Sequence, residues 1–309
     1  MKRVIIRLAS VMLLVAALVV PFTPAVSAAA DTPTYAFSTI DYPGSIVTAP
    51  WGINAAGDIV GAYVVPGERA HGFVLSEGFW TTVDVNSDNG TTVIGIGPSG
   101  EIVGDYQMPT DPAWKWRSFH ITKQGEVIDP VFGDHASTVP VRVLPDGTII
   151  GWVQDAVSPA TKYGVVLTPD GVLTKYDSLP NSQLNSGTPN GKTLVGTYKD
   201  AQGVSHGFIL ENSVRGPDID FPAQNVATTA VQEINPAGNV ISGYYVIAGV
   251  PHGFVAQRRG ASGWAFRTVD VPNALITVIR GANAGGALVG QYQDSSFKWH
   301  GFLATPVEP

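Results

Sequence analysis

Five residues in predicted loops have side chains suited to general acid and base chemistry. Two carboxyl groups held about 5–9 Å apart can hydrolyse a glycosidic bond, one as acid and the other as base or nucleophile. The sequence has no Gly-x-Ser-x-Gly turn for a serine nucleophile, and with no Cys a thiolate nucleophile or zinc ligand is excluded. A secreted hydrolase or lyase would use these candidate catalytic residues: Asp111, Asp134, His135, Asp155 and Asp294.

A second set of loop residues is suited to holding a ligand without reacting with it. Exposed aromatic rings with neighbouring charges stack on sugars or anchor a protein, because flat apolar surface gains free energy on burial. Alternatively, the same rings fold back over the sheet edges, since large aromatic side chains are mostly buried. The candidate binding residues are Trp114, Lys115, Trp116, Arg117, Lys298 and Trp299. We expect non-enzymatic binding, without cofactor or metal, and keep hydrolysis by the loop acids as the alternative.

The loops are positioned by six copies of one unit. Its core is an apolar pair followed by Gly-x-Tyr, as in Ile59-Val60-Gly61-Ala62-Tyr63, and some copies diverge from it. The core glycines are spaced 43, 47, 45, 47 and 47 residues apart: Gly61, Gly104, Gly151, Gly196, Gly243 and Gly290. Turns rich in Gly and Asn precede these cores, and each copy has room for four short strands with no helical period.

Four of the six histidines open the third strand of their copy in the sequence His-Gly-Phe. These are His71, His206, His252 and His300, and an Asp recurs near the fourth strand at Asp84, Asp220 and Asp270. Recurrence in most copies is what packing within a repeat predicts, and buried polar groups need hydrogen-bond partners. We therefore expect each His to bond within its own copy rather than to serve as a ligand around a ring.

The repeat predicts an all-β fold, a six-bladed β-propeller of four-stranded blades. Residues 37–43 have the pattern of a fourth strand, whereas the last copy ends after its third strand, near Leu303. Pairing these two segments would close the ring and remove exposed strand edges. A β-solenoid or open array is the alternative, but it would need distinct capping repeats, and the sequence shows none.

The chain resembles the HAF-repeat family of bacterial extracellular proteins in the succession GINAAGDIVGAY (residues 52–63), HGF (71–73) and Asp84. The resemblance extends over nearly all of the chain after residue 30, and the third copy, with Trp152-Val153 and Tyr163-Gly164-Val165, departs most. The family has no established general activity. The resemblance therefore implies an exported location and a repeat architecture rather than a particular reaction.

Residues 1–28 have the organisation of a secretory signal peptide. Lys2, Arg3 and Arg7 precede an apolar run over 11–20, and small residues allow cleavage after Ala28 or Ala30. The run is shorter than the roughly 20 residues that a spanning helix needs. We expect an extracellular, periplasmic or cell-surface protein with no membrane span after cleavage, one propeller domain over 35–305 and a short tail over 306–309.

The composition of the chain limits the classes of molecule that it can bind. The chain has 309 residues and a net charge of −7, and the signal peptide contributes three basic and no acidic residues to that balance. So acidic a surface repels phosphate backbones, which argues against nucleic acid as a partner. The chain also has 35 Gly and 23 Pro, the residues that many tight turns need. We expect a monomer whose partner is an extracellular carbohydrate or protein.

Overall fold

The computed structural model describes residues 34–85, 90–113, 115–129, 131–133, 135–155, 161–260 and 263–307. The chain divides into two units, Met1–Ala30 and Asp31–Pro309, and all described residues belong to the second. The expected signal peptide and the candidates Trp114 and Asp134 lie outside the described residues. Within the described ranges every regular element is a strand, and no helix there could cross a membrane.

Three antiparallel sheets follow the chain in order. The first contains β2 (Val47–Ile53), β3 (Ile59–Val64), β4 (Ala70–Ser76) and β5 (Phe79–Val83). The second contains β6 (Thr91–Ile96), β7 (Ile102–Tyr106), β8 (Arg117–Ile121) and β9 (Val127–Ile128). The third contains β10 (Ser137–Val143), β11 (Ile149–Gln154), β12 (Lys162–Leu167) and β13 (Leu173–Lys175). Each is the four-stranded unit that one copy of the repeat predicts.

The fourth and fifth copies form two such units that are joined into one sheet. The first half contains β14 (Ser182–Gly187), β15 (Thr193–Lys199), β16 (Ser205–Glu211) and the short β17 (Val214–Arg215). The second half contains β18 (Val226–Ile234), β19 (Val240–Ile247), β20 (Val250–Arg259) and β21 (Gly263–Thr268). A single parallel pairing, Ser205 with Thr228, joins the halves.

The last sheet combines the two ends of the described chain. Its order is β1 (Thr34–Ile40), β24 (Trp299–Val307), β23 (Leu288–Gln293) and β22 (Ile276–Ala282). β1 pairs antiparallel with β24 from Thr34 opposite Val307 to Ile40 opposite Gly301. The third strand thus continues two residues into the segment that we expected to be a tail. An early strand supplies the edge strand of the final copy.

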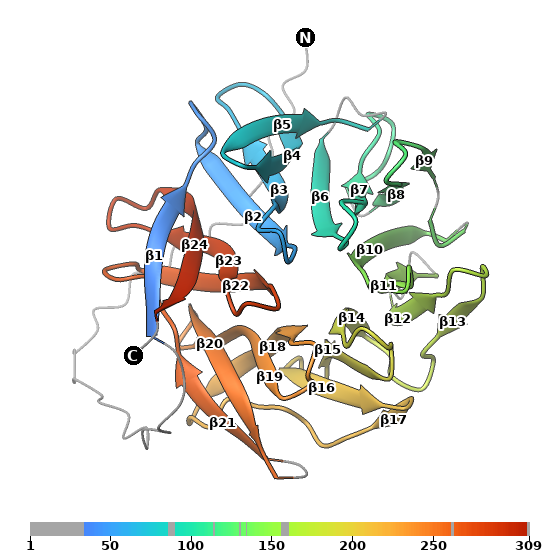
Figure 1. The fold of residues 1–309 in the computed structure, drawn as a ribbon. Coiled ribbons are helices and arrows are strands. Elements are labelled where there is room, and N and C mark those ends of the chain that lie inside the picture. Colours follow the sequence, from blue (N-terminus) through green and yellow to red (C-terminus); the bar gives the residue numbers. More distant parts are fainter. Residues whose placement is uncertain are drawn as a thin grey trace. The chain divides into compact units, whose positions relative to one another are not determined.

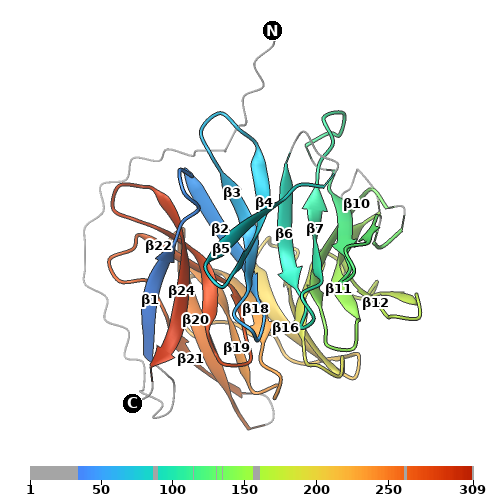
Figure 2. The ribbon, with the colours of Figure 1, turned by 45° about the horizontal axis from the view of Figure 1, so that its top comes forward.

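The sheets of the second unit are arranged as in a β-propeller (Figures 1 and 2). The first strands of the copies lie towards the middle in Figure 1, and the fourth strands lie at the rim. Each first strand contacts the next, and β2 contacts both β6 and β22. Turns between first and second strands open on one face, which we call the hairpin face. Connections from second to third strands open on the other, which we call the loop face.

The core lies between neighbouring sheets. The cluster between the first two sheets, for example, joins Val60 of β3 with Val93 of β6 and Phe119 of β8, all fully buried. The Phe of His-Gly-Phe is at most 1% exposed at each of its four positions, Phe73, Phe208, Phe254 and Phe302. Repetition of the motif is therefore explained by burial of one large ring per copy.

The glycine of Gly-x-Tyr lies where the second strand approaches the first most closely. A Cβ added at Gly290 would lie 2.0 Å from the carbonyl oxygen of Val278 and 3.0 Å from the Phe302 ring. Neither neighbour can retreat easily, because one is backbone and the other is a fully buried ring. This close approach within one sheet explains why the glycine recurs.

We expect Gly290→Ala to lower the free energy of unfolding by about 1–3 kcal/mol, the usual cost of overpacking a core. Urea unfolding followed by tryptophan fluorescence measures it. Gly285→Ala, in the hairpin of the same sheet, is the matched control because its Cβ would meet only Asn283 Oδ1, at 3.4 Å. Equal stability of the two variants would show that the close approach does not constrain the fold.

Candidate functional site

The four His-Gly-Phe histidines are each held by an aspartate that follows the fourth strand of the same sheet. Nδ1 lies 2.6–2.9 Å from a carboxylate oxygen in the pairs His71–Asp84, His206–Asp220, His252–Asp270 and His300–Asp41. In the last pair the acid follows β1, so the early strand also supplies the aspartate of the final copy. The prediction that these histidines bond within their own copies is confirmed.

The tyrosine of Gly-x-Tyr completes this arrangement. Its ring stacks on the histidine with centroids 5.0–5.3 Å apart in Tyr63–His71, Tyr198–His206, Tyr245–His252 and Tyr292–His300. The hydrogen bond that His252 donates to Asp270 raises the pKa of His252 above its ordinary value, against the opposing effect of burial. With a ring on one side and a carboxylate at Nδ1, these histidines serve the fold.

One of these pairs lies in a group that has the composition of a metal site. Ligand atoms of His206, Asp218 and Asp220 lie within 4.8 Å of one another. Arg215 forms an ion pair with Asp218, and the Tyr198 hydroxyl donates to the same carboxylate at 2.9 Å. Because protein contacts already engage all three side chains, we assign no metal to them.

The carboxylate of the candidate acid Asp111 is held by hydrogen bonds from residues of its own loop. Arg117 donates to its two oxygens from Nε at 2.7 Å and from Nη2 at 2.8 Å, and the Met108 amide donates at 2.9 Å. The Arg117 guanidinium holds the pKa of Asp111 below its ordinary value. A carboxylate that stays ionised in a bidentate pair is poorly suited to act as a general acid.

Two of the candidate catalytic residues are brought together. His135 Nδ1 lies 2.8 Å from Asp155 Oδ1, and Lys175 bonds to the other oxygen of Asp155. Lys175 also lowers the pKa of Asp155. The pair therefore consists of an imidazole and a stable carboxylate, and a second carboxylate, that of Asp177, binds the same Lys175 ammonium group at 3.0 Å.

Asp294 organises the hairpin that carries Lys298 and Trp299. Its Oδ1 accepts hydrogen bonds from the amides of Ser296 at 2.8 Å and Lys298 at 2.9 Å, and these bonds lower its pKa, that from Lys298 most. The other oxygen lies 3.3 Å from His300 Nε2. Lys298 is exposed and Trp299 is half-buried. The roles assigned to these two residues stay predictions.

Trp116 folds back onto the protein. It packs against a cluster that contains Ile94, Val139 and Trp152, and its amide donates to Ser137 Oγ at 3.0 Å. This is the second of the two arrangements that we considered for the loop aromatics. Trp116 is half-buried there, as is its neighbour Lys115. The Trp152 ring of that cluster also contacts Lys162, which lines the pocket described next.

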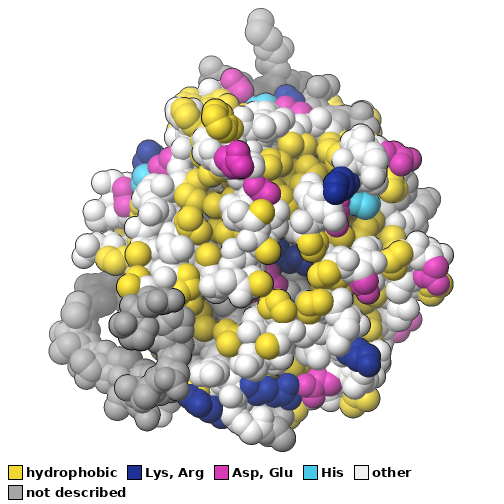
Figure 3. All heavy atoms as spheres, viewed as in Figure 1, with side chains coloured by type: hydrophobic (Ala, Val, Ile, Leu, Met, Phe, Trp, Pro, Cys, Tyr) yellow, Lys and Arg dark blue, Asp and Glu magenta, His cyan; other side chains and the backbone are white. Residues whose placement is uncertain are grey.

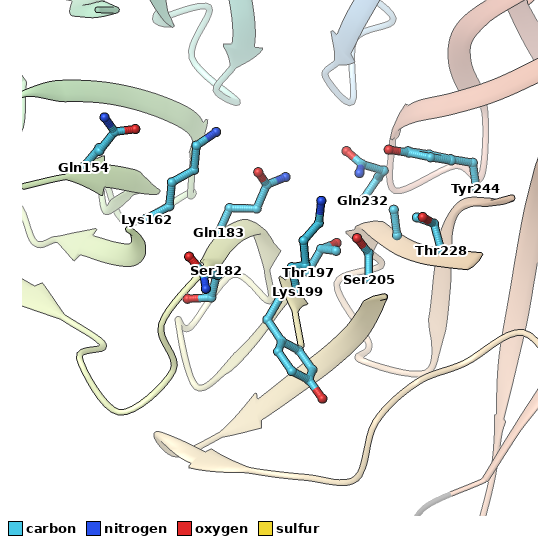
Figure 4. Close-up of a pocket in the computed structure, with 13 residues that line it drawn as sticks. Gln154, Lys162, Ser182, Gln183, Thr197, Lys199, Ser205, Thr228, Gln232 and Tyr244 are labelled. Carbon is cyan, nitrogen blue, oxygen red and sulfur yellow. The ribbon is translucent and has the colours of Figure 1, made fainter. Parts of the chain in front are cut away.

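The loop face carries a polar pocket of about 380 Å³ between the third, fourth and fifth copies. Figure 4 shows Lys162, Gln183 and Lys199 extending into it from one side, with Gln232 and Tyr244 reaching in from the other. Thirteen residues line it: Gln154, Lys162, Asn181, Ser182, Gln183, Thr197, Tyr198, Lys199, Ser205, Thr228, Ala230, Gln232 and Tyr244. None of them is acidic, so the pocket offers amides, hydroxyls and two ammonium groups.

The first strand of each copy carries a β-bulge in the part that pairs with the Gly-x-Tyr strand. The register of the first strands shifts by one residue at Trp51, Ile94, Val141, Asn185, Gln232 and Arg280. The first three are apolar and the last three polar. β-Bulges are common next to functional sites, where they change the direction in which a side chain points. The bulged residues are therefore apolar in copies one to three and polar in copies four to six, and among them Gln232 lines the pocket.

The hairpin face has a different opening. A cavity of about 160 Å³ is rimmed by Pro98, Pro145, Pro189 and Pro236. Figure 3, which views this face, shows apolar side chains around the centre and charged atoms within it. The lining includes the buried ion pair of Arg142 Nη2 and Glu233 Oε2, 2.6 Å apart. Burial raises the pKa of Glu233, and the Arg142 guanidinium opposes this.

Most of the pocket residues were not singled out from the sequence. We expected the loop face to carry the site, but chose its longest and most aromatic loop, which includes Trp114. The missed signal is the variable residue of Gly-x-Tyr and the residue after the Tyr. Thr197 and Tyr244 occupy the first position, and Gln154 and Lys199 the second. The residue type at each of these two positions differs between copies, whereas the residues around them are largely repeated.

Comparisons with known proteins show the fold. No protein-family model matches the chain, and no curated protein sequence matches it. TolB from Acinetobacter baumannii aligns over 81% of this chain and 64% of its own, with a TM-score of 0.53 and 12% identity. A gluconolactonase from Xanthomonas campestris aligns over 94% and 99%, with a TM-score of 0.50 and 14% identity. The chain has a β-propeller fold.

Proposed function

We propose that this chain is an exported, six-bladed β-propeller that binds an extracellular glycan, without chemistry, in the loop-face pocket. In this proposal β1 closes the ring as the fourth strand of the last blade, and the HAF-repeat resemblance and the leader over 1–28 account for an extracellular or periplasmic location. The rigid repeat serves as a platform, and function depends on the residues that vary between its copies.

The pocket between the third and fifth copies carries the proposal. Ligand sites are concave and have a few converging polar groups, and their volumes run from roughly 300 to 1,000 Å³. This pocket has about 380 Å³ and is lined mainly by uncharged hydrogen-bonding side chains. Amides and hydroxyls both donate and accept hydrogen bonds, which suits the hydroxyl groups of a sugar better than the apolar anchors of a protein partner.

Binding is favoured over hydrolysis by the condition of the candidate acids. A glycosidase needs one carboxyl group with a raised pKa and a second close to it. The pKa values of Asp111, Asp155 and Asp294 are all lowered, by Arg117, by Lys175 and by the amide of Lys298 respectively. None of these three is prepared to donate a proton.

A glycan array probed with the chain lacking residues 1–28 tests the proposal. We expect retention on at least one class of glycan and its loss in the double variant Gln183→Ala/Gln232→Ala, which removes two amides from opposite walls of the pocket. Gln124→Ala, at an exposed turn between β8 and β9, is the control. Retention that the double variant does not change would rule out the pocket, and release of shortened glycan would favour the hydrolase.

A further inference from the structure

The two lysines in the pocket have no carboxylate beside them. Lys162 and Lys199 both line it, and neither takes part in an ion pair among the described residues. Two other cations near the loop face are neutralised, Lys175 by Asp155 and Asp177, and Arg117 by Asp111. Two unpaired ammonium groups in one pocket are unexpected in a chain with a net charge of −7.

The lysines also lie near enough to affect each other. Burial lowers the pKa of Lys162, and the charge of Lys199 lowers it further. Lys162 Nζ lies 3.9 Å from the centroid of the Trp152 ring, which holds the ammonium group through a cation–π contact. Figure 4 shows the two amino groups on the same side as the Gln183 amide. A ligand anion between them would relieve their mutual repulsion.

A third cation lies behind the opposite wall. The Arg280 guanidinium is 4.3 Å from the Trp51 ring and 5.4 Å from the ring of Tyr244, which lines the pocket. Because the walls of the pocket have a low dielectric constant, the charge of Arg280 adds to the positive electrostatic potential within it. The pocket therefore combines a positive potential with the neutral groups Gln183, Gln232 and Ser205, which suit vicinal hydroxyls.

We propose that the pocket selects an acidic glycan, with the carboxylate of a uronic acid residue bound between Lys162 and Lys199. This inference rests on the proposed function and adds the charge class of its ligand. The amides of Gln183 and Gln232 and the Tyr244 hydroxyl bind the ring hydroxyls of the same or the next sugar. An acidic peptide is disfavoured because the lining offers no apolar pocket for a side-chain anchor.

Calorimetric titration with trigalacturonate and with galactotriose, its counterpart without carboxylates, tests the inference. We expect the acidic trisaccharide to bind at least tenfold more tightly, and Lys162→Gln/Lys199→Gln to remove that preference. The preference should also fall as salt is raised. Lys192→Gln is the matched control, because this exposed lysine lies in the hairpin between β14 and β15, outside the pocket. Sulfated dextran as a third probe separates carboxylate recognition from attraction to any polyanion.

The outcomes separate this inference from the proposed function. If both trisaccharides bind equally and Gln183→Ala/Gln232→Ala abolishes both, the glycan site stands and the acidic preference is refuted. If sulfated dextran binds as tightly as trigalacturonate, selection of a carboxylate is refuted. If neither trisaccharide nor any glycan on the array binds, both proposals fail. Unfolding midpoints of all variants are measured first, so that a loss of binding is distinguished from a loss of folding.

Discussion

Arg142→Met should lower the free energy of unfolding by about 3–5 kcal/mol, the cost of leaving one member of a buried ion pair without its partner. Arg142 and Glu233 are each 7% exposed, and their side chains join the third and fifth copies at the hairpin-face cavity. Without the guanidinium, the Glu233 carboxyl keeps only uncharged partners such as Ser186. Urea unfolding at pH 7 measures the loss.

A second variant shows whether the loss comes from the unpaired charge. Arg142→Met/Glu233→Leu replaces both charges by apolar side chains, and such replacements in other proteins are often neutral or stabilising. We therefore expect the double variant to recover most of the stability lost in the single one, and a double-mutant cycle gives the interaction energy. A single variant within about 0.5 kcal/mol of the parent would mean that the pair does not stabilise the fold.

Asp105→Asn should stabilise the protein at neutral and alkaline pH. Asp105 is 8% exposed, and its Oδ1 has no hydrogen-bond partner within the described part of the chain. Burial raises its pKa to about 7, although a hydrogen bond from Thr92 favours the ionised form. An unfolded Asp has a pKa of about 3.9. Between these two values the folded state holds a proton that the unfolded state has lost, so stability falls as pH rises across this interval.

The asparagine variant lacks this dependence. We expect its advantage over the parent protein to grow from pH 4 to about pH 7.5 and then to level off at about 2–4 kcal/mol; the interval between the two pKa values, at about 1.4 kcal/mol per unit, sets the upper limit. Unfolding curves at half-unit pH steps measure it. Glu126→Gln, at an exposed turn of the same sheet, should show no such trend. A pH-independent difference for Asp105→Asn would contradict the burial argument.

Much of the fold could be predicted because the repeat is a backbone pattern. Position 290 must be glycine because the carbonyl oxygen of Val278 lies too close for a Cβ. Similarly, Phe302 fills the core and His300 needs an acid nearby. These requirements recur in each copy and therefore appear as periodic letters. The strand near the start of the chain could be assigned for the same reason, since it carries the aspartate that the last copy lacks.

The pocket could not be predicted in the same way. Its residues come from three copies, and the sequence alone does not show which side of the ring becomes polar. The sequence did not identify Gln232 as a pocket residue because Gln232 occupies a bulge. One extra residue there reverses the alternation of side chains between the two faces of the strand. The long loop with Trp116 attracted attention through its composition, yet the ring of Trp116 packs inward. Variation at one repeat position was a better guide than the aromatic content of a loop.

The most direct test of the account is a crystal structure of the chain with the oligosaccharide that it retains most strongly on the array. We expect electron density for the sugar in the loop-face pocket, within hydrogen-bond distance of Gln183 and Gln232. Density elsewhere, at the hairpin-face opening around Pro145 or along the loop before Arg117, with the pocket left to solvent, would contradict it.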